Sequence, residues 1–172
     1  PKDIRAFMAR AGELGVAQAL TFLREVDEIN MRRRTRTVEL ARDLLGGSLL
    51  GARIACLGAA FKPDSDDVRD SPALNVAAAL QLHGATVTVH DPHAMPNAAR
   101  LFPTLTYSPT TEAALTDADL VILLTEWRDY RDLDPTTTAT WVTHPRILDA
   151  RNALDPHTWR TAGWTYKGIG RP

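Results

Sequence analysis

Apolar residues recur at helical spacing in the first part of the chain. Residues 17–45 contain no Gly or Pro, and apolar side chains such as Leu20, Leu23 and Val38 return every three or four positions. This spacing predicts one long helix, about 42 Å at 1.5 Å per residue. A shorter helix capped by Asp3 precedes it, and Gly12 and Gly15 are expected to break the pattern between them. The long helix exceeds what so small a domain can cover, so one face should meet another subunit or domain.

From residue 49 onward, short apolar runs alternate with helical patterns. The spacing predicts strands at residues 54–57, 86–90, 104–107, 120–124, 145–149 and 163–166, and helices at 72–81, 96–101 and 111–118. A further helix between 124 and 145 is too weakly marked to place. Strands that alternate with helices predict an α/β fold with a Rossmann-like, doubly wound parallel sheet. We therefore expect a helical segment at residues 1–47 and an α/β domain at residues 48–172.

A long charged connection joins the first expected strand to the next helix. It extends from Gly58 to Pro72 and contains one Lys, one Arg and four Asp. Ligands of α/β proteins bind at such connections, and most of them are shorter than this one. Lys62 and Arg69 are therefore candidate phosphate ligands. The alternative is that both pair with neighbouring Asp residues in a surface network.

Other residues follow the carboxyl ends of expected strands. Only Gly58 is present where a dinucleotide-binding fold carries three glycines, so phosphate binding must come from elsewhere. Asp91 stands where such folds often hold a ribose, but Asp91-Pro92 is equally typical of a turn. Arg151 follows the strand at 145–149 and could converge on the same crevice as Lys62, or be a solvated loop residue.

Composition narrows the classes of partner. The formal net charge of -1 gives no electrostatic footprint for nucleic acid, and no apolar run is long enough to span a bilayer. The five His show no metal-ligand spacing, and Cys56 lies in an apolar strand where an inert thiol is expected. We therefore expect no metal, no nucleic acid and no membrane partner. A single Cys fits the reducing cytoplasm.

Several stretches together resemble one family. They are residues 60–73, Asp91-Pro92, Thr125-Glu126-Trp127 and Asp149-Ala150-Arg151-Asn152, and their order and spacing are similar to the C-terminal half of UDP-glucose 6-dehydrogenases in the UDP-glucose/GDP-mannose dehydrogenase family. The resemblance implies that NAD oxidises a sugar C6 alcohol to a carboxylate, through a thiohemiacetal and a thioester on a cysteine. Pro1-Lys2-Asp3 resembles the tail of the motif that carries this cysteine. The chain is therefore expected to be a piece of a longer enzyme, without its NAD domain and inactive alone.

The resemblance also implies roles for single residues. It assigns proton transfer to Asp3, NAD contacts to Lys2 and Arg69, and contacts to UDP-glucose or a related nucleotide sugar to Phe61, Lys62 and Arg151. The long helix would join the two domains and form a homodimer. Two alternatives stay open: a dehydrogenase of another nucleotide sugar, such as UDP-N-acetylmannosamine or GDP-mannose, and a non-catalytic nucleotide-binding dimer module.

Overall fold

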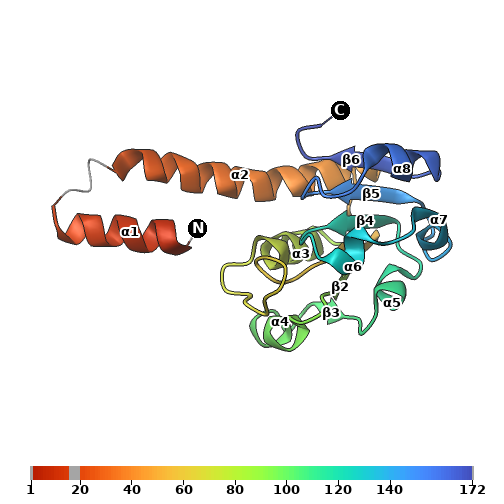
Figure 1. Cartoon of the computed structure of the whole chain (residues 1–172), viewed down its shortest axis with the longest axis horizontal. Coiled ribbons are helices and arrows are strands. Elements are labelled where there is room, and N and C mark those ends of the chain that lie inside the picture. Colours follow the sequence, from red (N-terminus) through yellow and green to blue (C-terminus); the bar gives the residue numbers. More distant parts are fainter. Residues whose placement is uncertain (1, 16–19, 172) are drawn as a thin grey trace. The chain divides into compact units, whose positions relative to one another are not determined.

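The computed structural model describes residues 2–15 and 20–171, apart from the side chains of residues 2, 3, 5 and 21. The chain separates into two compact units, residues 1–36 and 37–172, which are described separately. The first unit contains helix α1 (Lys2–Glu13) and the first part of helix α2 (Thr21–Leu44) (Figure 1). Gly12 lies inside α1, contrary to expectation. Gly15, with a φ of +73°, follows the end of that helix, as expected.

Helix α2 occupies most of the predicted range of residues 17–45, of which residues 17–19 lie outside the described part. Its last turns belong to the second unit, where Val38, Leu40 and Ala41 are buried in the core. Before these turns, the helix presents Phe22, Val26 and Ile29 as exposed apolar side chains within the first unit. Apolar side chains therefore occur along the helix in both units.

Six parallel strands form one sheet in the order β3-β2-β1-β4-β5-β6. Their bounds are β1 Arg53–Leu57, β2 Thr86–His90, β3 Thr106–Tyr107, β4 Leu120–Leu123, β5 Arg146–Asp149 and β6 Thr165–Gly168. Ile54 of β1 lies opposite Val87 of β2 on one side and Leu120 of β4 on the other. The predicted Rossmann-like parallel sheet is therefore confirmed. The strand order reverses between β1 and β4, and this switch point is where ligands of such sheets bind.

Short helices flank the sheet (Figure 1). They are α3 Pro72–Leu82, α4 Met95–Leu101, α5 Thr111–Leu115, α6 Arg128–Arg131, α7 Pro135–Thr138 and α8 Pro156–Thr161. The sequence pattern missed α8 and placed the last strand two residues too early. Trp164 instead belongs to the turn after α8, where its backbone N–H donates to the Trp159 carbonyl at 3.2 Å. Between residues 124 and 145, where the sequence pattern was too weak to place a helix, the chain forms the two four-residue helices α6 and α7, which are too short to show a period.

The central strands are buried on both faces, as the continuous apolar runs indicate. All four residues of β4 are buried, and Cys56 of β1 has no exposed surface. Burial raises the pKa of the Cys56 thiol to about 12, so this thiol is un-ionised at neutral pH. The expectation that Cys56 lies in the core is confirmed. In the described part of the chain, no helix has the length and apolarity that crossing a membrane requires.

Candidate functional site

Gly58 brings the end of β1 against the end of β4. Its φ is +112°, a conformation that favours glycine, and its N–H donates to the His90 carbonyl at 2.8 Å. A Cβ at this position would lie 2.6 Å from the backbone nitrogen of Thr125. Gly58 therefore allows the loops after β1 and β4 to lie in direct contact at the switch point. This contact explains the glycine without a bound pyrophosphate.

The next two residues are held entirely by side chains from other segments. The N–H groups of Ala59 and Ala60 donate to Oδ2 of Asp91 at 2.7 and 2.9 Å. The Ala59 carbonyl accepts from Ser71 Oγ at 2.6 Å, and the Ala60 carbonyl accepts from Thr125 Oγ1 at 2.8 Å. All four backbone polar groups are thus satisfied. This arrangement fixes the backbone that leads into the charged connection.

Asp91 is fully buried, and its carboxylate organises three loops. Besides the two alanine amides, Oδ2 accepts from Trp127 Nε1 at 3.1 Å, and Oδ1 accepts from the backbone N–H groups of His93 and Ala94 at 3.0 and 2.8 Å. A carboxylate offers about four lone-pair positions, so five donors use its capacity. Asp91 therefore shapes a turn, which was one of the two alternatives for Asp91-Pro92. Its carboxylate has no acceptor position left for a ribose hydroxyl. The sequence did not predict its contacts with the loops after β1 and β4.

Phe61 and Lys62 extend from this fixed backbone toward solvent. The Phe61 N–H donates to the Asp67 carbonyl at 2.8 Å, while its ring is 43% exposed. Lys62 is exposed, and among the described residues it makes no hydrogen bond or ion pair. The surface-network alternative therefore does not describe Lys62. An exposed aromatic ring and an exposed ammonium group on consecutive residues can together bind a ligand that carries an apolar ring face and an anion.

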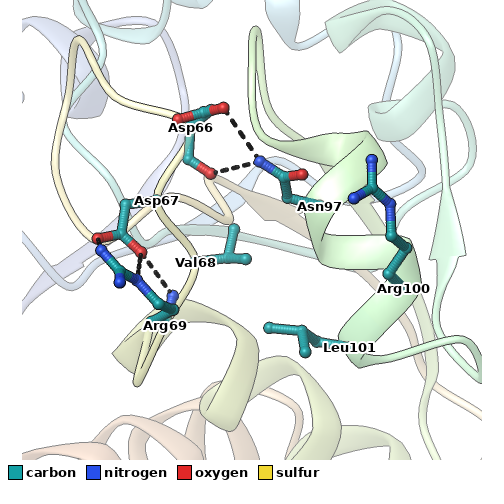
Figure 2. Close-up of a pocket in the computed structure, with 7 residues that line it drawn as sticks. All are labelled: Asp66, Asp67, Val68, Arg69, Asn97, Arg100 and Leu101. Atoms are coloured by element: carbon teal, nitrogen blue, oxygen red, sulfur yellow. Dashed lines mark hydrogen bonds and ion pairs between the residues drawn. The ribbon is translucent and has the colours of Figure 1, made fainter.

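Arg69, by contrast, is paired within the connection. Its Nε and Nη2 donate to the two carboxylate oxygens of Asp67 at 2.9 and 2.8 Å (Figure 2). The hydrogen bond that Arg69 donates to Asp67 and the charge of Asp67 raise the pKa of Arg69, whose side chain stays 72% exposed. The surface-network alternative thus describes this residue. An open pocket of about 390 Å³ separates the connection from α4, and its lining residues are Asp66, Asp67, Val68, Arg69, Asn97, Arg100 and Leu101.

Arg151 is held by a residue from the neighbouring loop. Its Nε and Nη2 donate to the carboxylate of Glu126 at 2.5 and 2.9 Å, joining the loops after β4 and β5. Burial alone would raise the pKa of Glu126, but the hydrogen bonds from Arg151, a backbone hydrogen bond, and the charges of Arg151 and Arg131 together lower that pKa. Arg151 is therefore not a freely solvated loop residue. The sequence marked Glu126 only by its place after a strand, and its partnership with Arg151 was missed.

A second buried carboxylate fixes the loop that carries Arg151. Asp149 has no exposed surface and accepts from the backbone N–H groups of Arg151 and Leu154, both at 2.9 Å, and from Tyr166 Oη at 2.8 Å. Burial first, and then the hydrogen bond to Asp149, raise the pKa of Tyr166. Asn152 has a φ of +53° and donates to the Ile169 carbonyl at 3.0 Å. The end of β5 is thus organised as the end of β2 is.

Two predicted site residues fall outside this description. Lys2 and Asp3 lie in α1, and their side chains are outside the described part of the chain. The other predicted site residues, Phe61, Lys62, Arg69 and Arg151, all follow carboxyl ends of strands at one edge of the sheet. Within residues 2–15 and 20–171, no three His, Cys, Asp or Glu side chains are grouped as metal ligands would be.

Known proteins of one family match the part of the chain that contains this edge of the sheet. Residues 55–156 match the model described as "UDP-glucose/GDP-mannose dehydrogenase family, UDP binding domain", and this match covers more than half of the chain. The UDP-glucose 6-dehydrogenase of Pseudomonas aeruginosa is 35% identical over 178 residues, which cover 100% of this chain and 39% of the relative. That of Rhizobium meliloti is 40% identical over 127 residues, covering 74% of this chain and 29% of the relative.

Solved structures agree with this match. A UDP-glucose dehydrogenase from the hyperthermophilic archaeon Pyrobaculum islandicum superposes with a TM-score of 0.80 at 32% identity, covering 100% of this chain and 37% of that one. An NDP-N-acetyl-D-galactosaminuronic acid dehydrogenase from Methanosarcina mazei gives 0.74 at 29% identity, covering 88% and 31%. The chain thus spans about two fifths or less of the length of these relatives. It belongs to the UDP-glucose/GDP-mannose dehydrogenase family.

Proposed function

We propose that this chain is the nucleotide-sugar-binding part of an NAD-dependent UDP-glucose 6-dehydrogenase, which oxidises UDP-glucose to UDP-glucuronate. The observation that carries the proposal is the pair Phe61 and Lys62 at the switch point. Both side chains are exposed, and Lys62 is uncommitted among the described residues, although the backbone before them is held by Asp91, Ser71 and Thr125. A binding surface with a fixed backbone loses little conformational entropy when a ligand arrives.

Arg151 supports an anionic substrate at the same edge. Its guanidinium is oriented by the fork with Glu126, while Nη1 makes no hydrogen bond within the described part of the chain. A planar guanidinium can hold a carboxylate on one side and meet a phosphate oxygen on another. In the proposed site, Lys62 and Arg151 together neutralise the diphosphate, and Phe61 packs against the sugar or the base.

The residues of this chain can supply one contact to NAD, but they do not form a complete dinucleotide-binding site. The turn after β1 has a single glycine, and the acceptor capacity of Asp91 is used by five N–H donors. Arg69, with Nη1 directed away from its Asp67 fork, fits a contact to a phosphate of the cofactor. NAD supplies the hydride acceptor, and in this proposal another domain of the longer enzyme holds most of it. Lys2 and Asp3 would act beside it, in cofactor contact and proton transfer.

We also propose that the enzyme is a homodimer formed through α2. Phe22, Val26 and Ile29 are spaced four and three residues apart, so they share one face of the helix. They are 60%, 37% and 45% exposed in the first unit. An apolar stripe of this kind on a helix favours contact with a second copy of the helix.

One comparison supports a different substrate in place of UDP-glucose. The Methanosarcina mazei relative, described as an NDP-N-acetyl-D-galactosaminuronic acid dehydrogenase, superposes nearly as well as the Pyrobaculum islandicum enzyme. The alternative proposal is therefore a dehydrogenase of another nucleotide sugar, such as UDP-N-acetylmannosamine or GDP-mannose. NADH formation by the full-length enzyme on a panel of these sugars separates the two, and preference for a sugar other than UDP-glucose would overturn the first.

The role of Lys62 is tested by Lys62→Ala in the full-length enzyme. Loss of a hydrogen bond to a charged group should raise the KM for UDP-glucose roughly tenfold to a hundredfold. The control is Arg53→Ala, which removes a cation at the opposite end of β1, where Arg53 pairs with Asp117 at 3.4 Å. The control should leave the KM unchanged. If Lys62→Ala also left it unchanged, the proposed substrate contact would be wrong.

A further inference from the structure

Asp67 connects the two ends of the charged connection that carry proposed contacts. Its backbone carbonyl accepts the N–H of Phe61 at 2.8 Å, directly before Lys62. Its carboxylate accepts three hydrogen bonds from Arg69: from the backbone N–H at 3.0 Å, from Nε at 2.9 Å and from Nη2 at 2.8 Å (Figure 2). One residue therefore fixes the backbone at the substrate end and the side chain at the other end.

We propose that Asp67 is a positioning residue that holds the Arg69 guanidinium ready for a phosphate of the cofactor. This inference rests on the proposed function. The fork occupies Nε and Nη2, and Nη1 stays without a hydrogen bond in the described part of the chain. Without the fork, a side chain that is 72% exposed would sample many rotamers. The fork orders the guanidinium before NAD arrives, so less conformational entropy is lost when NAD binds.

The carboxylate of Asp67 has an opposing effect, because it repels the same phosphate. The Asp67 side chain is 31% exposed, and that of Arg69 more than twice as much. Water and salt screen charge interactions at such exposed positions, whereas the planar geometry of the fork is unaffected by screening. The ordering effect should therefore outweigh the repulsion. Removing Asp67 should therefore weaken NAD binding.

Asp66 provides a matched control on the same loop. Its carboxylate accepts from Asn97 Nδ2 of α4 at 3.1 Å and makes no hydrogen bond with Arg69 (Figure 2). Asp66→Ala removes the same charge next to the same pocket and leaves the Arg69 fork intact. A change seen with Asp67→Ala and absent from Asp66→Ala therefore reports on the fork, and not on the net charge of the loop.

The experiment measures the dissociation constant of NAD by calorimetric titration of the full-length enzyme. Asp67→Ala should raise it roughly threefold to tenfold, the effect of leaving one long side chain to be ordered on binding. Asp66→Ala should leave it unchanged, and neither variant should alter the dissociation constant of UDP-glucose. In an Arg69→Ala background, the further change Asp67→Ala should have no effect, because Asp67 acts through Arg69.

Other outcomes would overturn the inference. An unchanged or tighter NAD constant in Asp67→Ala would show that the fork does not assist binding. A weaker NAD constant that persists in the Arg69→Ala background, or an equal weakening for UDP-glucose, would show that Asp67 only maintains the shape of the loop. A wild-type enzyme that makes no NADH from any nucleotide sugar would contradict the proposed function itself, which is a separate result.

Discussion

At the scale of single residues, burial decides what an aspartate does. Three Asp-Pro dipeptides begin at Asp91, Asp134 and Asp155 and look alike in the sequence. Asp134 and Asp155 cap α7 and α8, and hydrogen bonds within the first turn, chiefly from Thr137 and Thr158, lower their pKa values. Asp91 is buried and also collects donors from the loops after β1 and β4. The same dipeptide therefore caps a helix at Asp134 and Asp155, and at Asp91 it supplies a buried carboxylate that joins three loops.

We predict that Asp91→Asn strongly destabilises the chain. An amide would direct an NH₂ group at N–H donors that the carboxylate now accepts, in a site without exposed surface. The expected loss is roughly 2–4 kcal/mol in the free energy of unfolding, measured by urea denaturation. Asp134→Asn, in the same dipeptide at an exposed cap, should cost clearly less. Equal losses for the two variants would contradict the central role of Asp91.

The pair of Glu126 and Arg151 predicts a dependence on pH. Because the pKa of Glu126 is lower in the folded chain than its ordinary value of 4.5, the pair contributes stability that is fully present above pH 4.5. This contribution disappears as the pH falls through the folded pKa. The free energy of unfolding of the wild type should therefore approach that of Glu126→Gln in acid. Urea denaturation at pH 7, 4 and 3 measures it.

A control for this pH dependence is Glu112→Gln, because the Glu112 side chain makes no ion pair among the described residues. At pH 7 this variant should reduce the free energy of unfolding less than Glu126→Gln does. If the two variants lost the same free energy, the fork with Arg151 would add nothing to stability in solution.

The sequence predicted which residues follow the carboxyl ends of strands better than it predicted the partners of those residues. Lys62, Arg69 and Arg151 could be singled out because each follows an expected strand. The two arginines differ from Lys62 because Asp67 and Glu126 reach them, whereas Lys62 has no hydrogen bond or ion pair among the described residues, and this depends on three-dimensional geometry. Spacing along a chain does not encode whether a guanidinium reaches a carboxylate 25 positions away, as Arg151 reaches Glu126.

At the scale of elements, the turn after β1 depends on one glycine. We predict that Gly58→Ala costs roughly 3–5 kcal/mol, because a φ of +112° is strained for alanine and its Cβ would meet the backbone of Thr125. Gly163→Ala is the control: its φ is +89°, but no atom lies within 4 Å of the added Cβ, so strain alone should cost roughly 1–2 kcal/mol. Thermal unfolding followed by circular dichroism compares them.

The strands could be predicted because parallel strands buried on both faces are continuous apolar runs, as in β4. The helices α6, α7 and α8 were not placed, because each has only four to six residues and no longer apolar-periodic segment marks it, whereas α5 lies within a longer helical pattern at residues 111–118. A local signal did exist for two of them. Asp134-Pro135 and Asp155-Pro156 combine a capping side chain with a proline in the first turn, which is a helix start.

At the scale of the whole molecule, the apolar stripe on α2 predicts an assembly. Phe22→Glu places a charge among Val26 and Ile29, and desolvating that charge should raise the dissociation constant of the proposed homodimer roughly tenfold or more. The control is Leu82→Glu on α3, which is 87% exposed. Analytical ultracentrifugation of the full-length enzyme measures both variants. A wild type that is monomeric, or a Phe22→Glu variant with unchanged mass, would contradict the proposed interface.

The backbone at residues 59–62 is held by side chains from other segments, and this has a consequence for protein engineering. The loop is held in place by Asp91, Ser71 and Thr125, and the side chains of Phe61 and Lys62 take no part in that hold. Positions 61 and 62 can therefore be randomised together without unfolding the loop that displays them. A library at these two positions, screened against different nucleotide sugars, would select variants whose side chains at this edge of the sheet recognise different sugars.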